Sequence, residues 1–507
     1  MTGRPRKVAP LGITLDPATS VPLHRQIGEQ IRHAILERRL APGLRLPSSR
    51  LMAAELNCAR GTVLMAVDQL VAEGYLVAQA GSGLSVAANL PDEMLAPPVV
   101  HSARESPSRR KPVLARRAVE LLADEPADAV LDGSPRAFPT GQPDRDAFPF
   151  PLWAKLLERD WRKPAWSIAG APHPFGDPRL RSAIAAYLGM ARGFSCDAGA
   201  IVITLGLRQS LSLFAGIALD GGDEAWIEEP GFAGTREALA MAGVKAVAVP
   251  VDASGFPLEA AMALAPHARL AVVAPSHQFP LGVVLSLQRR LALLSWAERT
   301  NGWIAEDDFD GEYRYAGRPL APLRALDRTG RVAYLGSFSK LLFPALRLSY
   351  VVLPDALVPA AEKVMAAAPA RASMLGQGAL ARFIADGHFT AHLRRTRLLY
   401  SARQQVLIAA ARRHLRGLLQ VEPDPGGMHL VARPHTDLEP KLDDRAVTAA
   451  AAAESIGVSP LSACYRNEPR VNGLILGYAA TPADAVEPAI VTLRNVLLQL
   501  YKPAHAK

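Results

Sequence analysis

Short runs of apolar residues recur along the chain from about residue 200 onward. They read IVITLG at 201–206, AWIEEP at 225–230, KAVAVPV at 245–251, LAVVAP at 270–275, WIAEDD at 303–308, VAYLGS at 332–337 and LSYVVLP at 348–354. Most are continuous rather than alternating, which is typical of strands buried on both faces of a mainly parallel sheet. Helical patterns separate them, for example at 207–219, 233–242 and 286–300. This order predicts βαβ units and a doubly wound α/β domain.

The pattern changes after the last of these runs. An alanine-rich helical region covers 355–415. The elements predicted beyond it are strands near 428–432 and 473–480 and helices near 441–456 and 483–500. We therefore expect one domain over 138–503, in which a smaller C-terminal α+β lobe begins at about 380.

The N-terminal region has a different pattern. In PLHRQIGEQIRHAILER, at 22–38, apolar residues recur every four positions at Leu23, Ile27, Ile31 and Ile35. This spacing predicts an amphipathic helix with Pro22 in its first turn.

Two more helices and a hairpin are predicted next. PGLRLPSSRLMAAELN gives a turn and a second helix, for which Ser48 is a suitable cap. ARGTVLMAVDQLVAEG gives a third helix that ends at Gly74, and YLVAQAGSGLSVA gives two short strands around GSG. Helix, helix–turn–helix and hairpin form the plan of a winged helix–turn–helix over 20–88. Residues 89–127 are rich in Pro, Ser and Arg, and they predict a flexible basic linker.

Composition adds limits on domain number and location. With 507 residues, of which 49% are hydrophobic, the chain is expected to form two or three globular domains. It has no apolar run long enough to span a membrane, and MTGRPRKVAPLG lacks the apolar segment of a secretory signal. The three cysteines, Cys58, Cys196 and Cys464, are scattered without a CxxC pair. This usage favours the reducing cytoplasm.

The net charge of +9 is unevenly distributed. Residues 1–120 carry 16 Lys and Arg against 10 Asp and Glu, whereas the rest of the chain is nearly neutral. A basic N-terminal region is consistent with contact to a polyanion, although a basic face is equally often only solvated.

The N-terminal motifs resemble the GntR family of bacterial regulators. The resemblance is carried by LPSSRLMAAEL, by RGTV at 60–63, by QLVAEGYL and by the GSG of the hairpin. It implies double-stranded DNA as the partner, with contacts from Arg50, Arg60 and Thr62 and with the wing at Gly81, Ser82 and Gly83 near the minor groove. A winged helix that makes only protein contacts is the alternative.

Two positions depart from the GntR pattern. The family often has serine or threonine where Ala59 stands here, and a basic residue where Leu64 stands. Base readout is therefore expected to rely on fewer polar side chains than is usual.

A lysine in apolar surroundings is the main chemical candidate. Lys340 lies in SFSKLLFPALRLSY, between two strand-like runs. A lysine amine forms a Schiff base with an aldehyde when it is deprotonated and held in place. Pyridoxal 5'-phosphate is such an aldehyde, and it also needs a carboxylate for its ring nitrogen, a flat side chain for its ring and a cradle for its phosphate.

The chain offers each of these groups. Asp307 follows a strand, at the edge of the sheet where ligands bind. TLGLRQSL, around Gly206, is a strand–glycine–helix junction suited to a phosphate. Ser337 and Arg347 flank the lysine and could complete the cradle. Each group alone is more often structural, so the prediction depends on their combination.

The region from about 138 to 480 resembles the fold-type I aminotransferases, and more closely the aminotransferase-like domain of the MocR subfamily of GntR regulators. The motifs are PFGDPRLRSAIAAYL, EEPGFAGTR, APSHQFPLGVVLSLQRRLALL, AEDDFDGEYRYAGRPL and GSFSKLLFPALRLSYVVLP. The resemblance implies that Lys340 forms the Schiff base and Asp307 pairs with the pyridine nitrogen. It also implies that Phe232 stacks on the ring, and that Ser337 and Arg347 hold the phosphate.

Four positions depart from the pattern of active aminotransferases. Phe309 stands for a tyrosine, Phe279 for an asparagine and Leu205 for the first hydroxyl residue of the phosphate loop. Ile475 stands where an arginine binds the substrate carboxylate. Without that anchor an amino acid loses the orientation that transamination needs. The sequence leaves open whether another arginine replaces it; the candidates are Arg466, Arg470 and Arg433.

Three histidines remain. We interpret His277 as a member of a polar network rather than as a catalyst, and we leave His173 and His429 unassigned.

Three hypotheses for the whole chain follow. It is a homodimeric transcription regulator that senses pyridoxal phosphate or an amine effector, a working aminotransferase with a DNA-binding domain, or a regulator that has lost the cofactor.

Overall fold

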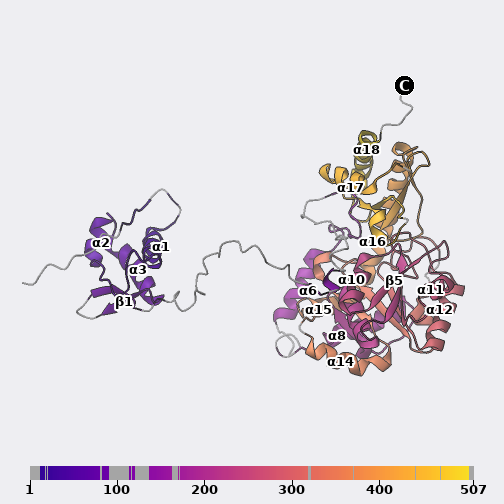
Figure 1. Cartoon of the computed structure of the whole chain (residues 1–507), viewed down its shortest axis with the longest axis horizontal. Helices are drawn as coiled ribbons and strands as arrows, with labels where there is room; N and C mark the ends of the chain where they lie inside the picture. The colour runs from indigo at the N-terminus through magenta and orange to yellow at the C-terminus, as the bar shows by residue number, and fades with distance from the viewer. Residues whose placement is uncertain are drawn as a thin grey trace, which may run out of the picture. The chain divides into compact units, whose positions relative to one another are not determined.

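The computed structural model describes residues 12–16, 19, 21–79, 83–88, 90, 114–115, 117–119, 136–162, 170, 172–317, 321–368, 370–439, 441–468 and 470–501. The chain divides into two compact units, Met1–Pro112 and Val113–Lys507 (Figure 1). Most of the predicted linker and two residues of the predicted wing, Gly81 and Ser82, lie outside the described residues.

The first unit has the predicted winged helix–turn–helix elements. They are α1 (Leu23–Leu36), α2 (Ser49–Glu55), α3 (Arg60–Ala72), β1 (Leu76–Gln79) and β2 (Gly83–Val86). The two strands pair in antiparallel register. Ile27, Ile31 and Ile35 of α1 are buried against α3, as their spacing predicts. The Ser48 hydroxyl caps α2 by accepting a hydrogen bond from the Leu51 amide at 3.3 Å.

The second unit is built on a seven-stranded sheet, and all seven strands match the predicted apolar runs. In chain order they are β3 (Ile201–Thr204), β4 (Glu224–Glu229), β5 (Lys245–Pro250), β6 (Leu270–Val273), β7 (Trp303–Asp308), β8 (Val332–Ser337) and β9 (Ser349–Val352). The spatial order is β3-β9-β8-β7-β6-β4-β5. Only β9 is antiparallel to its neighbours within this sheet. The link from β8 to β9 contains no long crossover helix, and a parallel pairing would need one.

Helices cover both faces of the sheet. The larger ones are α6 (Phe150–Arg162), α8 (Pro178–Ala191), α9 (Leu207–Ala218), α10 (Ala233–Met241), α11 (Leu258–Leu264), α12 (Leu287–Thr300), α14 (Val358–Ala367), α15 (Gln377–Ala385) and α16 (His388–His414). Phe214 of α9 and Leu239 of α10 belong to the core on one face, and Trp296 of α12 belongs to the core on the other. The doubly wound prediction is therefore confirmed.

Short elements complete this part of the chain. They are the single-turn helix α13 (Leu323–Leu326) and the 3-10 turns Ala198–Ala200, Pro344–Leu346, Asp355–Leu357 and Leu461–Cys464. The α8 helix, which the periodicity did not single out, is capped by Asp177 and begins with Pro178.

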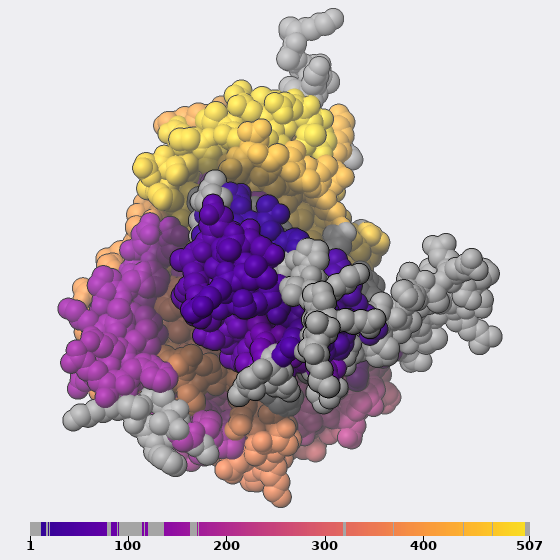
Figure 2. Space-filling model, turned by 90° about the vertical axis from the view of Figure 1, so that its left-hand side faces the viewer, coloured from indigo at the N-terminus to yellow at the C-terminus, as the bar shows by residue number. Residues whose placement is uncertain are grey.

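The smaller lobe contains a second, antiparallel sheet. Its strands are β10 (Leu419–Val421), β11 (His429–Pro434), β12 (Ser459–Pro460) and β13 (Leu474–Gly477), in the order β10-β11-β13-β12. The helices α17 (Asp444–Ala453) and α18 (Ala483–Leu500) pack against each other. In Figure 2 the yellow C-terminal residues gather at one end of the second unit. No helix in the described part of the chain is long and apolar enough to cross a membrane.

Candidate functional site

The predicted DNA-contacting side chains of α2 and α3 lie near the start of each helix. Arg50 in α2 and Arg60 at the start of α3 are both exposed, and Thr62 is half-buried. The Arg60 Nε donates a hydrogen bond to Ser49 Oγ at 3.3 Å, which ties the two helices of the helix–turn–helix together. The structure thus brings the side chains of Arg50, Arg60 and Thr62 to the N-terminal ends of two adjacent helices.

A further arginine joins this surface near the wing. Arg45 forms a β-bridge with Ser85 and is exposed. Gly83, with φ of 87°, comes so close that a Cβ there would lie 3.8 Å from Arg45 Nε. Sequence reasoning did not single out Arg45, although it lies in PGLRLPSSR, the segment that leads into α2.

The second unit gathers the lysine and two aromatic rings. Lys340 follows β8 and is half-buried. Its Nζ atom lies 5.6 Å from the ring centroid of Phe232 and 5.1 Å from that of Phe309. Phe279 packs edge-on against both rings, with centroids 6.2 Å and 6.3 Å away. The amine therefore lies among flat apolar groups.

Three acids stand in a row at the end of β7, and for the middle one, Asp307, no hydrogen-bonding partner is found in the described part of the chain. Its neighbour Glu306 accepts hydrogen bonds from the Leu323 amide at 2.7 Å and the Arg324 amide at 2.9 Å. The other neighbour, Asp308, pairs with Arg192 and accepts a hydrogen bond from the Tyr334 hydroxyl at 2.5 Å. Along a strand, alternate side chains point to opposite faces, so Asp307 is turned away from these partners.

Loss of contact with water is the main influence on the pKa of Asp307. Burial raises the pKa of this carboxyl to about 7, although the charge of Lys340 acts to lower it. Glu228, at the end of β4, is a second acid of this kind: burial and then Asp307 raise its pKa to about 8. Its Oε2 atom accepts a hydrogen bond from the Ala274 amide at 3.2 Å. Sequence reasoning missed Glu228, but its signal is the same, because an acid ends a buried strand.

The predicted phosphate cradle is only partly assembled. Gly206 is the N-cap of α9, and Ser337 Oγ accepts a hydrogen bond from Ser349 Oγ at 3.1 Å. The α9 helix packs against β8, which ends at Ser337. The Leu205 amide, however, already donates to Gln209 Oε1 at 2.7 Å. Arg347 is exposed, and no hydrogen-bond or ion-pair partner for its side chain is found among the described residues.

The position of the expected carboxylate anchor is apolar. Ile475 in β13 is 1% exposed and packs with Leu461 and Cys464. Two of the candidate replacements are engaged elsewhere. Arg466 Nη1 donates to the Ala246 carbonyl at 3.3 Å, and Arg470 Nε pairs with Glu468 Oε1 at 3.2 Å. Arg433 is exposed on β11.

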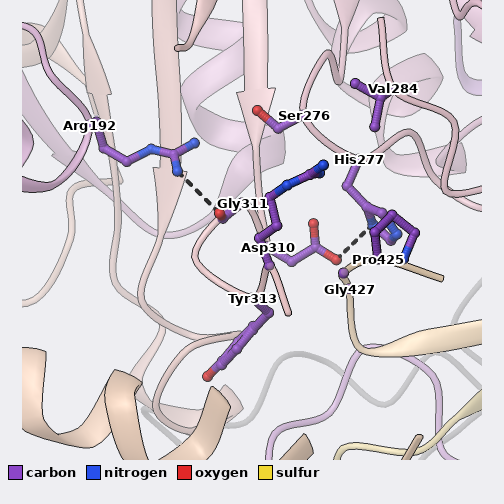
Figure 3. A pocket seen from close by; sticks show the side chains of 11 residues that line it. Arg192, Ser276, His277, Val284, Asp310, Gly311, Tyr313, Pro425 and Gly427 are labelled. Atoms are coloured by element: carbon purple, nitrogen blue, oxygen red, sulfur yellow. Dashed lines mark hydrogen bonds and ion pairs between the residues drawn. The ribbon is translucent and has the colours of Figure 1, made fainter. Parts of the chain in front are cut away.

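His277 lies in a buried charged network, as predicted (Figure 3). Its Nδ1 atom donates a hydrogen bond to Asp310 Oδ2 at 3.1 Å, and its Nε2 atom lies 3.4 Å from Asp424 Oδ1. Burial alone would lower the pKa of His277, but the two carboxylates outweigh it and raise the pKa to about 10. The network borders a cavity of about 20 Å³, which is room for a water molecule but not for a ligand.

The other two histidines have local partners. His429 Nε2 hydrogen-bonds the Pro280 carbonyl at 2.9 Å, and burial together with the charge of His277 lowers its pKa to about 4. His173 Nδ1 accepts a hydrogen bond from the Phe175 amide at 3.1 Å. Both are explained by local structure.

Comparison with known proteins gives two family matches. The family "Bacterial regulatory proteins, gntR family" matches residues 23–86, and "Aminotransferase class I and II" matches residues 139–472. A "Probable rhizopine catabolism regulatory protein MocR" from Rhizobium meliloti is 40% identical over 489 residues, which cover 96% of each chain. The "HTH-type pyridoxine biosynthesis transcriptional regulator PdxR" of Corynebacterium glutamicum is 33% identical over 97% of this chain and 98% of its own.

Solved structures agree on the fold of the second unit. A kynurenine aminotransferase from Pyrococcus horikoshii superimposes with a TM-score of 0.66 at 24% identity, over 77% of this chain and 96% of its own. At this level of identity the likeness concerns the fold alone.

Proposed function

The chain belongs to the MocR subfamily of GntR regulators, and from this premise we propose that it is a DNA-binding transcription regulator whose aminotransferase-like domain binds pyridoxal 5'-phosphate as a sensor of cofactor or effector. One observation carries the proposal. A single chain joins a winged helix with exposed arginines to an aminotransferase-like fold. In that fold Lys340 lies beside Phe232, and its charge acts to lower the pKa of Asp307.

The residues present fit this cofactor. Asp307 is half-buried and has no hydrogen-bonding partner among the described residues, and its carboxyl complements a cationic ring nitrogen. At Gly206, a Cβ would meet no atom within 4 Å, so the N-terminus of α9 is open to a phosphate. When bound, pyridoxal phosphate supplies an aldehyde that a lysine or a free amine can capture.

The chain's own residues have separate tasks in this proposal. Lys340 would attach the ligand, and Asp307 would hold the proton of the ring nitrogen. Phe232 and Phe309 place apolar rings beside the amine. Ser337, Gly206 and Arg347 would hold the phosphate, and for Arg347 this requires its exposed side chain to turn inward.

Regulation requires that the ligand distinguish two arrangements of the protein. A ligand shifts an equilibrium only by its difference in affinity for the two states. We infer a homodimer in which occupancy of the lysine site changes the spacing of two winged helices, which bind two operator half-sites. Residues 20–88, 89–127 and 138–503 are then the DNA-binding domain, the linker and the sensor domain. Because the target is DNA, we expect the protein in the cytoplasm.

The sensor assignment is tested with Lys340→Ala. The wild-type protein with pyridoxal phosphate is expected to show a visible absorption band from the Schiff base, and its operator affinity should change as cofactor is added. Lys340→Ala should lose both the band and the cofactor response while it still binds DNA. Lys363→Ala, at an exposed lysine of α14, is the matched control. An unchanged band in Lys340→Ala would show that another lysine is used.

A cofactor that binds without altering operator affinity would contradict the sensor role. In that case the cofactor would be a structural group only. Failure to bind at all would favour the regulator that has lost its cofactor.

The DNA contact is tested with Arg60→Ala. Loss of a base contact should weaken operator binding by about 1–3 kcal/mol and relax specificity at one base pair. Arg25→Ala, at an exposed cation of α1, controls for the loss of positive charge. Affinities for operator and for random duplexes are compared at one salt concentration, since salt alone changes them. An equal loss on both would assign Arg60 to phosphate.

An active aminotransferase is the second candidate, because the lysine and the acid that such enzymes need are both present. The apolar surroundings of Ile475 argue against it, since an amino-acid carboxylate finds no cation at that position. Single-turnover reaction with a panel of amino acids distinguishes the two. Rapid conversion of the cofactor to its amine form, followed by steady turnover, would favour the enzyme.

A further inference from the structure

Two large apolar side chains lie exposed on the recognition helix. Leu64 and Met65 of α3 are 38% and 57% exposed, respectively. The buried face of the same helix consists of Val63, Ala66, Val67 and Leu70. A single exposed apolar residue is ordinary, but two adjacent ones on a helix that enters a groove call for a partner.

This apolar pair is continuous with the proposed DNA contacts. Leu64 is one turn beyond Arg60, and residues four apart lie side by side on a helix surface. Arg60 is fixed to α2 through Ser49 Oγ at 3.3 Å. In helix–turn–helix proteins the first turns of the recognition helix contact base edges, so the pair lies where bases are read.

Charge supports the same placement. The only charged residues of α3 are Arg60 and Asp68, so this helix has little positive charge for phosphates. The exposed cations Arg45 and Arg50 lie on the segments before it, where they can contact the backbone instead. The only apolar group that a base pair presents in the major groove is the C5-methyl of thymine.

We propose that Leu64 and Met65 determine operator specificity by contacting thymine methyl groups next to the base pair read by Arg60. The contact would remove apolar surface of the two side chains and of the thymine methyl groups from water, which favours binding. This inference rests on the proposed DNA binding, and it adds to that binding the kind of base that is read.

The experiment removes methyl groups from the DNA rather than from the protein. The full-length protein first selects duplexes from a random-sequence library, and each thymine of a selected duplex is then replaced by uracil, which lacks only the methyl. We expect about a fourfold loss of affinity at one or two positions for the wild type. Leu64→Ala and Met65→Ala should each bind the thymine duplex several-fold more weakly and lose the sensitivity to uracil at one position.

A control variant separates specificity from general apolar loss. Leu36→Ala removes a side chain that is 45% exposed at the end of α1, and it should keep the wild-type response at every position. Thermal melting of each variant checks that the exposed substitutions leave the fold intact.

Several outcomes would overturn the inference. The inference is contradicted if replacing thymine by uracil lowers the affinity of Leu64→Ala and Met65→Ala as much as that of the wild type. Variants that lose affinity equally for selected and random DNA, or that change only self-association, would also contradict it, because the pair would then face phosphate or protein. A selection that yields no preferred sequence would contradict the proposed function itself, whereas a preferred sequence without methyl dependence contradicts only this inference.

Discussion

Two groups of acids in the second unit, Asp310 with Asp424 and Asp307 with Glu228, differ in whether a histidine lies between them. Asp310 and Asp424 have the His277 side chain between them, which gives each carboxylate a cationic partner. No ion pair joins Asp307 or Glu228 to another described residue, and burial raises the pKa of both, although the charge of Lys340 opposes this at Asp307. The first group is joined by an ion-pair network, whereas the second is partly neutral near pH 7.

This difference separates a structural role from a binding role. A buried acid that is paired within the protein fixes the segments that carry it, here the loops after β6 and β7 and the small-lobe loop before β11. A desolvated acid without an ion-pair partner costs free energy in the ligand-free protein, and a cationic ligand recovers that cost. We therefore expect substitutions in the first group to affect folding and substitutions in the second to affect the ligand.

His277→Asn should have the largest effect. It leaves Asp310 and Asp424 buried without a counter-charge, which should lower the free energy of unfolding by about 3–5 kcal/mol. Because the pKa of His277 is raised to about 10 in the folded chain, its contribution is complete below its unfolded value of about 6.5. It is lost as the pH rises through 10. The free energies of unfolding of the wild type and the variant should therefore approach each other as the pH rises. Urea unfolding of both proteins from pH 6 to 10 measures this.

His435→Asn is the matched control for that experiment. His435 also lies beside an acid, Asp437, at 3.9 Å, but the histidine side chain is 48% exposed and the acid 96% exposed. Its loss should be almost without effect. A loss of stability in His277→Asn no larger than in this control would remove the contrast between the two groups of acids.

Asp307→Asn should affect the ligand instead. Loss of a charged hydrogen bond to the ring nitrogen should weaken cofactor binding by about 1.5–3 kcal/mol, measured by titration of the absorption band. The ligand-free variant should be more stable than the wild type above pH 7. The wild type loses stability as the pH rises from about 4 to 7, since folding then requires a buried charge. Asp355→Asn, at an exposed acid, is the control; unchanged cofactor affinity in Asp307→Asn would reject the assignment.

Glu228→Gln should have the smallest effect. Because the pKa of Glu228 is raised to about 8, the side chain is already largely neutral at pH 7, and glutamine keeps an acceptor for the Ala274 amide. Cofactor affinity at pH 7 should therefore change by less than about 1 kcal/mol. If Glu228→Gln weakened binding as much as Asp307→Asn, both acids would serve the ligand.

Much of the fold follows from local sequence. Seven continuous apolar runs gave seven strands of the large sheet, because a strand buried on both faces needs apolar side chains at every position. The antiparallel direction of β9 and the short strands β10 and β12 were not predicted. Direction depends on the connection, and strands of two or three residues have no measurable period.

The candidate site was only partly accessible from the sequence. Lys340, Asp307 and Phe232 were found as separate motifs on a chain that resembles known families, and the aromatic contacts of Lys340 connect them. The motif alone does not show which of its three acids, Glu306, Asp307 and Asp308, lacks a hydrogen-bonding partner. That depends on the Leu323 and Arg324 amides and on Arg192, which lie on other segments.

The sequence by itself determined the two-part design, the order of the elements and the residue types that the chemistry needs. Those properties are local, since they depend on periodicity, caps and the side chains of one segment. Only the tertiary structure decided that Asp307 is unpaired while Asp310 and Asp424 share His277, and that Leu64 and Met65 are exposed while Ile475 is buried. Pairing and burial are relations between segments far apart in the chain, and they exist only once those segments pack together.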